Sequence, residues 1–238
     1  MGMRVTSHPR HSGPGSQREH APLVALEMAV PWWAERAGRT PWHRGHIAER
    51  FGLFTIIVLG ECVLAATTGI QEAITAGGLS LSLVTLACGA LVLIGAMWWA
   101  YFKHNAAEER DLQHETAFLW GYGHYAVFAA VAAVGAGLKV AADLTHQDAG
   151  IEPITASLVV AVPVAIYLVA AWLVHRSGRA GAIFRPVLLA VVLVLGAAVG
   201  IGPVNLPLSI LAMGLIVATL VGVAAYRASR QPVVATAG

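Results

Sequence analysis

Charged side chains are scarce in this sequence. Asp, Glu, Lys and Arg make up 12% of the 238 residues, and hydrophobic residues make up 57%. Soluble domains carry about 25% charged and about 45–50% apolar residues. A chain of this length has too little interior to hide so much apolar surface from water. The composition therefore excludes a water-soluble enzyme, a nucleic-acid-binding protein and a disordered protein, and it predicts a protein that crosses a membrane several times.

Cysteines and catalytic motifs are also few. The two cysteines, Cys62 and Cys88, both lie within apolar segments, so we interpret them as small packing residues rather than as a disulfide or a metal cluster. The net charge of +2 does not indicate a polyanionic partner. The sequence has no phosphate-binding glycine loop, no nucleophile elbow and no H-E-x-x-H zinc motif. We therefore expect neither an enzyme nor a bound cofactor.

Long apolar segments occupy most of residues 51–226. There are six of them: Phe51–Thr68, Leu79–Phe102, Ala117–Ala142, Ile154–Val174, Ile183–Gly202 and Leu208–Tyr226. Each has about the 17–25 residues that a helix needs to cross the hydrocarbon core of a bilayer. Barrel strands are shorter and alternate polar with apolar residues, whereas these segments are apolar on every face. The sequence predicts an all-α transmembrane bundle of six spanning helices.

The regions outside the bundle are more polar. Residues 1–21 are rich in Arg, His, Pro, Gly and Ser and have no apolar core, which predicts a disordered segment and not a signal peptide. Residues 22–50 begin with a short apolar stretch, Pro22–Ala34, which we interpret as an interfacial or partial helix followed by a cytoplasmic linker. Residues 227–238 are predicted to form a cytoplasmic tail.

Basic residues alternate between the connections. Lys and Arg precede the first segment and occur in the second and fourth connections and in the tail. They are absent from the other three connections, Gly69–Gly78, Asp143–Pro153 and Pro203–Pro207. Basic residues in short loops stay on the cytoplasmic side of a membrane. The pattern predicts that both termini are cytoplasmic.

Small residues predict where the helices approach one another closely. Gly196 and Gly200 are four residues apart, and the third segment contains Gly135 and Gly137. Glycine lets two helix backbones come together within a membrane. We expect these glycines to lie at contacts within the bundle.

An ionisable residue, Glu61, lies near the middle of the first apolar segment. An ionised carboxylate at this depth costs at least about 2.5–3.5 kcal/mol. The side chain should therefore face a polar cavity, pair with another group or carry a proton. Two interpretations remain open: a functional site, or a protonated side chain that bonds a neighbouring helix and only fixes the packing.

His124 lies about two turns inside the third segment from its cytoplasmic end. Histidine can carry a proton near neutral pH. We expect the first and third helices to pack together, with Glu61 and His124 facing the same interior space and one or two waters between them. These two residues form a candidate proton or cation site. The alternative is a neutral His124 whose hydrogen bond is satisfied within the bundle.

Further polar residues lie near the ends of the helices. Lys139 can extend to the interface and pair with Asp143, four residues along the chain. His46, Glu49 and Arg50 precede the first segment and form a candidate polar cluster at the cytoplasmic mouth of the bundle. Nothing in their spacing is specific for a metal ion, so we predict no metal site.

One segment resembles a known family. His46–Glu61, with the sequence HIAERFGLFTIIVLGE, resembles the hallmark of the bacterial low temperature requirement protein A family. Three further segments match in the same order: Thr40–His43, Trp98–Phe102 and Trp120–His124. The residues that match the family's pattern are His46, Glu49, Arg50, Gly60, Glu61, Trp99, Tyr101, Gly123 and His124. The resemblance extends from about Pro22 to the C-terminus.

This resemblance implies a multi-pass protein of the bacterial cytoplasmic (inner) membrane that is associated with growth in the cold. It implies no reaction. Family members are usually longer, with more helices ahead of the hallmark. We therefore expect an N-terminally shortened chain whose partners are the lipid bilayer and either a second copy or a protein that supplies the missing helices.

Two functions fit these observations. In the first, the protein is transporter-like: Glu61 binds a proton or cation, and His124 relays or gates. In the second, the protein transports nothing and supports envelope function or cold-stress tolerance, and the same residues only hold the fold. The sequence does not indicate which substrate a transporter-like protein would carry. It indicates no nucleic-acid partner for either function.

Reporter fusions test the predicted topology. Because basic connections stay inside, fusions after Arg110, Arg179 and Arg230 should be active as cytoplasmic reporters. Fusions after Gly77 and Asp148 should be active as extracytoplasmic reporters. A cytoplasmic signal at Asp148 would contradict the six-helix topology.

Overall fold

Four stretches of the chain are described by the computed structural model, together with a few isolated positions between residues 22 and 33. The stretches are residues 44–108, 114–145, 150–175 and 180–230. The chain divides into two units, Met1–His43 and Arg44–Gly238, and the second contains the fold. Outside the described residues lie the predicted disordered segment, most of residues 22–43, the end of the predicted tail, and the connections that carry Arg110, Asp148 and Arg179.

The described part of the second unit is helical and has no strand. Its six helices are α2 (Arg44–Gly77), α3 (Leu81–Glu108), α4 (His114–Asp143), α5 (Pro153–Val174), α6 (Ala180–Gly200) and α7 (Leu206–Ser229). All six predicted helices are confirmed. Most extend beyond their apolar segments, because hydrogen bonds along a helix continue into the polar residues that flank its apolar part.

Five helices are long and apolar enough to cross a membrane. The candidate spans are Gly45–Gly77, Leu81–Lys103, Trp120–Asp143, Pro153–Val174 and Leu206–Arg227. The apolar part of α6 that the structure describes, Arg185–Gly200, is shorter. The described chain is therefore a multi-pass helical membrane protein with five candidate spans. A sixth span and the cytoplasmic position of both termini stay predictions.

A tight turn joins α2 to α3. Gly78 has a φ angle of +79°, a left-handed conformation that glycine adopts without steric cost. The Ser80 hydroxyl then accepts a hydrogen bond from the backbone N–H of Leu83, at 3.2 Å, and so caps the start of α3. The Gly77-Gly78 pair that marks a break in the sequence thus folds α3 back beside α2.

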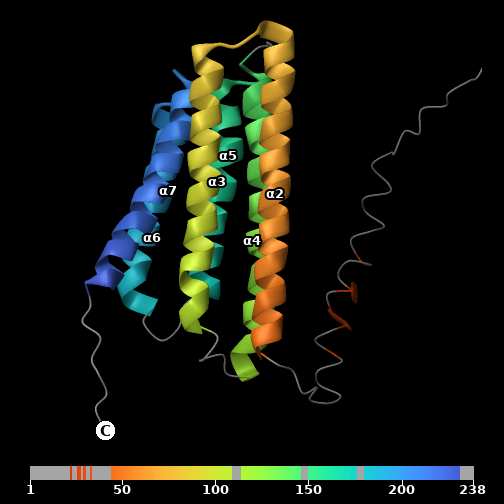
Figure 1. Ribbon diagram of the computed structural model, residues 1–238, viewed down its shortest axis with the longest axis vertical. Helices are drawn as coiled ribbons and strands as arrows, with labels where there is room; N and C mark the ends of the chain where they lie inside the picture. The colour runs from red at the N-terminus through yellow and green to blue at the C-terminus, as the bar shows by residue number, and fades with distance from the viewer. Residues whose placement is uncertain are drawn as a thin grey trace, which may run out of the picture. The chain divides into compact units, whose positions relative to one another are not determined.

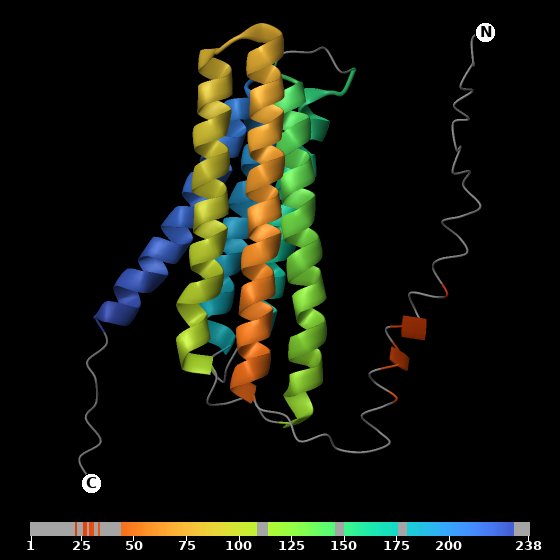
Figure 2. The same cartoon turned by 45° about the vertical axis from the view of Figure 1, so that its right-hand side comes forward.

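The six helices form a closed ring. The most extensive contacts follow the order α2, α4, α5, α6, α7 and α3, and α3 returns to α2; smaller contacts join α5 to α7 and α3 to α4. Figure 2 shows α2 (orange) between α3 (yellow) and α4 (green), and Figure 1 shows α6 and α7 on the other side of α3 from α2. Because α2 packs chiefly against α4 and α3, a large part of its surface remains outside the described bundle.

Two glycines on α4 allow the backbones of neighbouring helices to come close. The Cα of Cys62 on α2 would lie 3.0 Å from a Cβ added at Gly135. The backbone oxygen of Val159 on α5 would lie 2.9 Å from a Cβ added at Gly137. The predicted packing role of these two glycines is confirmed.

The glycine pair on α6 behaves differently. A Cβ added at Gly196 or Gly200 would meet no atom within 4 Å, so their predicted role in packing is wrong for the described bundle. A close contact that the sequence did not reveal joins α3 to α7. There a Cβ at Gly89 would come within 2.7 Å of the backbone nitrogen of Leu211, and Gly214 faces the Gly89 carbonyl.

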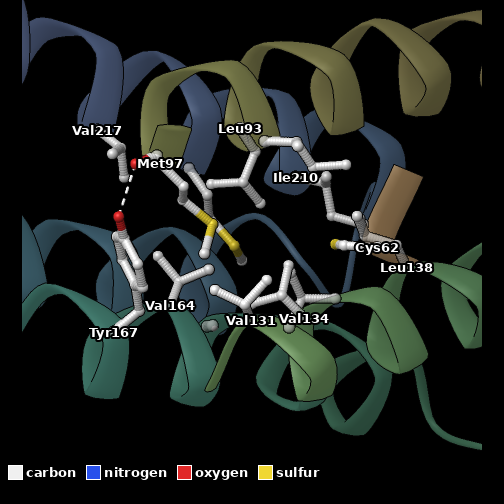
Figure 3. Close-up of a cluster of buried hydrophobic side chains, with 14 of the residues drawn as sticks. Cys62, Leu93, Met97, Val131, Val134, Leu138, Val164, Tyr167, Ile210 and Val217 are labelled. Carbon is white, nitrogen blue, oxygen red and sulfur yellow. Dashed lines mark hydrogen bonds between the residues drawn. The ribbon is translucent and has the colours of Figure 1, made fainter. Parts of the chain in front are cut away.

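The core lies where α3, α4, α5 and α7 meet. Figure 3 shows Met97 and Leu93 of α3 packed against Val131 of α4 and Val164 of α5. Within this apolar cluster the hydroxyl of Tyr167 donates a hydrogen bond to the carbonyl oxygen of Met97, at 2.6 Å. The bond joins α5 to α3 across the bundle and satisfies a fully buried phenol.

Substitution of Gly89 tests the α3–α7 contact. Gly89→Ala should lower the free energy of unfolding by about 1–3 kcal/mol, because the new methyl group meets backbone atoms that cannot rotate away. Gly196→Ala is the matched control: it adds the same methyl group in open space and should leave stability unchanged or slightly raised. Tryptophan fluorescence during unfolding in detergent measures both. Equal stability of the two variants would contradict the packing described here.

Candidate functional site

His124 is the one fully buried ionisable side chain among the buried polar residues of the described bundle. Its Nδ1 lies 2.8 Å from the carbonyl oxygen of Trp120, one turn earlier on α4. Its Nε2 lies 2.9 Å from the hydroxyl oxygen of Tyr101 on α3. Because a carbonyl can only accept, Nδ1 carries the proton and donates it, and in a neutral imidazole Nε2 accepts from Tyr101. Both ring nitrogens are satisfied.

Aromatic rings surround this imidazole. The ring centroids of Trp120 and Phe51 lie 4.2 Å and 4.6 Å from that of His124, and Phe128 lies 5.8 Å away. Phe51 comes from α2, so the cluster joins three helices near one end of the bundle. A cage of this kind favours the uncharged form of the imidazole, because an ion loses its hydration there.

His175 extends the cluster to α5. It caps the end of that helix, with its Nδ1 2.8 Å from the carbonyl oxygen of Ala171, and it is half-buried. Its ring lies 5.0 Å from that of Tyr101 and 6.4 Å from that of His124. The rings of Tyr101, His124 and His175 thus form a triangle, in which each ring lies near the other two. We call Phe51, Tyr101, Trp120, His124, Phe128 and His175 the His124 cluster.

Sequence reasoning found His124 but missed two of its neighbours. Tyr101 was noted only as part of a family motif, and His175 was not noted. The predicted topology could have revealed both neighbours. It places the end of the second segment, the start of the third and the end of the fourth at the same end of the bundle. Polar residues at these three places would be expected to meet.

Glu61 lies elsewhere. Helices α2 and α4 pack side by side, as predicted, but the Glu61 side chain is exposed on the outside of α2. The expectation that Glu61 and His124 face one interior space is therefore wrong. They are also separated along the helix axis: Phe51 contacts His124, and Glu61 lies about 15 Å further along α2 at roughly 1.5 Å per residue.

The rotation of α2 explains the position of Glu61. One stripe of α2 is buried, with a spacing of three and four residues: Gly52, Thr55, Leu59, Cys62, Ala66, Gly69 and Ala73. Most of these side chains are small, so this is the face that can approach α4 most closely. Successive residues of a helix are about 100° apart, and Glu61 is consequently turned away when Cys62 points inward.

The other candidate residues lie near the ends of the helices. His46, Glu49 and Arg50 are exposed in the first turns of α2, and His46 Nδ1 lies 3.8 Å from a carboxylate oxygen of Glu49. They lie on the surface of α2, and the polar cluster at the cytoplasmic mouth stays a prediction. Among the residues with described positions, no three His, Cys, Asp or Glu side chains lie close enough together to hold a metal ion.

Lys139 has two carboxylate partners. Its ammonium group pairs with Glu72 of α2 and lies 3.9 Å from a carboxylate oxygen of Asp143. The predicted pairing with Asp143 is confirmed, and Glu72 is an additional partner that joins α4 to α2. The ion pair thus joins α2 to α4 at this end of their contact. At the other end, the aromatic rings of the His124 cluster pack the two helices together.

The closed ring of apolar helices defines the class of this protein, a multi-pass helical membrane protein. A comparison with protein-family models matches residues 19–225 to the bacterial low temperature requirement A protein (LtrA). The chain belongs to this family. The comparisons with curated proteins and with solved structures give no match.

Removal of the Tyr101 hydroxyl tests the His124 cluster. Tyr101→Phe leaves the Nε2 of His124 without its donor in a buried site, which should lower the free energy of unfolding by about 1–3 kcal/mol. Tyr125→Phe removes the same hydroxyl from an exposed position on α4 and should be neutral. Unfolding of both variants in detergent gives the comparison, and a neutral Tyr101→Phe would contradict the hydrogen bond described above.

Proposed function

We propose that this chain is a non-transporting membrane protein that acts by associating with other chains in the bilayer, in support of envelope function in the cold. In this proposal the buried polar residues hold the helices together and bind no cargo. The name of the family, which refers to a low temperature requirement, agrees with a role of this kind.

The proposal rests on the hydrogen bonding inside the bundle, where every buried polar side chain of the described residues has a partner. The buried polar side chains of the described bundle are Thr55, His124, Ser157 and Ser209. Thr55 donates to the carbonyl oxygen of Phe51, at 2.8 Å, and the two serine hydroxyls lie 2.8 Å apart. Throughout the described residues every buried side-chain nitrogen or oxygen has a hydrogen-bond partner. A cation site would need free oxygen ligands or a carboxylate facing inward.

The outward position of Glu61 supports the same proposal. A carboxyl group on the lipid-facing side of a span costs about 2.5–3.5 kcal/mol or more. Contact with another polypeptide that offers a hydrogen-bond partner removes this cost. A protein that associates within the membrane thus gives Glu61 a role that an isolated bundle does not.

A proton-handling function is the second candidate. The observation that favours it is the sequence of groups from His124 through Tyr101 to His175, each able to donate and accept protons. In this version the protein is transporter-like, and His124 relays a proton between the interior and the end of α5. Glu61 then lies outside the bundle and takes no part in the relay.

Flux measurements separate the two candidates. Purified protein in proteoliposomes, with imposed gradients of protons, Na⁺, K⁺ or Mg²⁺, should give no flux above that of empty liposomes, because the described interior presents no unpaired ligand. A proton flux that His124→Gln abolishes and Tyr125→Phe preserves would overturn the non-transporting proposal in favour of the relay. Growth of a deletion strain in the cold, complemented by each variant, shows which variants retain the biological role.

A further inference from the structure

The side of α2 that faces away from α4 carries a second stripe with the same spacing as the buried one. Its members are Ile57, Glu61, Leu64, Thr68, Gln71 and Thr75, and all of them are exposed. We call these six residues the outer stripe. A repeat of three and four residues is the pattern by which two helices pack along a shared seam. The outer stripe is thus a seam for which the described bundle provides no partner helix.

Two members of the outer stripe, Glu61 and Gln71, have polar side chains without a partner among the described residues. The hydroxyls of Thr68 and Thr75 donate to carbonyl oxygens of their own helix, at 2.9 Å each. Within the part of the chain that the structure describes, no hydrogen bond or ion pair involves the side chains of Glu61 and Gln71. Glu61 lies near the middle of the apolar segment Phe51–Thr68, where lipid offers neither a donor nor an acceptor, and Gln71 lies nearer the end of α2.

The chemistry of these two side chains fits a second copy of the same chain. A protonated carboxyl and a carboxamide each carry a donor and an acceptor, so each can bond to an identical group. Two copies inserted in the same orientation are related by a twofold axis along the membrane normal, and equal residues then meet at equal depth. Any other partner would need two matching polar groups separated by about 15 Å along a helix, whereas a second copy has them by symmetry.

The surroundings of Glu61 leave room for such a contact. A Cβ added at the adjacent Gly60 would meet nothing within 4 Å, so another helix can approach closely beside the carboxyl. At the N-terminal end of α2, Arg50 continues the outer stripe and Glu49 is exposed next to it. Their opposite charges allow each copy to pair with the other there instead of repelling it.

We propose that two copies of this chain form a parallel dimer through the outer stripe of α2, with their Glu61 carboxyl groups bonded to each other in the interface. This inference rests on the proposed function, since it names the partner with which the chain associates. Polar residues within transmembrane helices are known to drive association of this kind.

Disulfide crosslinking of the full chain in liposomes tests the geometry. The exposed Cys88 is first replaced by Ser, and a single cysteine is then introduced. Leu64→Cys should crosslink into a dimer under mild oxidation, because equal residues of the seam meet across the axis. Val192→Cys, which is exposed on α6, is the matched control and should remain monomeric. Equal crosslinking at the two positions, or none at either, overturns the proposal.

Fluorescence energy transfer between labelled copies, measured as the protein is diluted with lipid, tests the role of Glu61. Glu61→Leu should weaken the dimer about tenfold, because an interhelical hydrogen bond is lost, and Glu61→Gln should retain it. Unchanged association of Glu61→Leu overturns the proposal. Should that variant fail to fold, the crosslinking of Leu64→Cys still decides, because it keeps the native Glu61.

The outcomes also separate this inference from the proposed function. A wild-type chain that stays monomeric at every lipid ratio, or a Leu64→Cys that crosslinks in native membranes only to a different protein, overturns the dimer and leaves a non-transporting protein. Flux through proteoliposomes overturns the proposed function whether or not the dimer forms.

Discussion

The contact between Cys62 on α2 and Gly135 on α4 sets how α2 is rotated about its own axis. The absence of a side chain at Gly135 lets the Cys62 backbone come so close that a Cβ there would lie 3.0 Å from it. Further along the same contact, Gly69 faces Lys139 and Ala142 of α4. Because a helix is rigid, this one seam decides the direction of every other α2 side chain, including Glu61.

Two consequences follow from that rotation. Phe51 is brought against His124, where it helps to close an aromatic cage around an imidazole that makes two hydrogen bonds. Glu61 is brought to the outside, together with Gln71. The same helix therefore contributes an apolar ring to a satisfied interior and polar groups to the membrane-facing surface. This division is why we assign the interior a structural role and the outer stripe of α2 a role in association.

The sequence was sufficient to predict the helices but not their rotation. A backbone in lipid must satisfy its hydrogen bonds internally, so long apolar segments predict helices, and all six are found. Rotation is harder because these segments are apolar on every face, and polarity gives no sign of which side is buried. The depth of Glu61 in its apolar segment suggested that its side of the helix faces inward, whereas the small residues Cys62, Ala66 and Gly69 mark the side that is buried. His124 was found because it is an ionisable residue well inside an apolar segment.

The most direct test of this account is the phase of lipid exposure along α2. Single nitroxide labels at each position from 59 to 69, in a chain without native cysteines and at high lipid dilution, report collisions with oxygen dissolved in the bilayer. We predict maxima at Glu61 and Leu64 and minima at Cys62 and Ala66. A minimum at Glu61 with a maximum at Cys62 would contradict the rotation of α2, and with it the assignment of interior and outer residues.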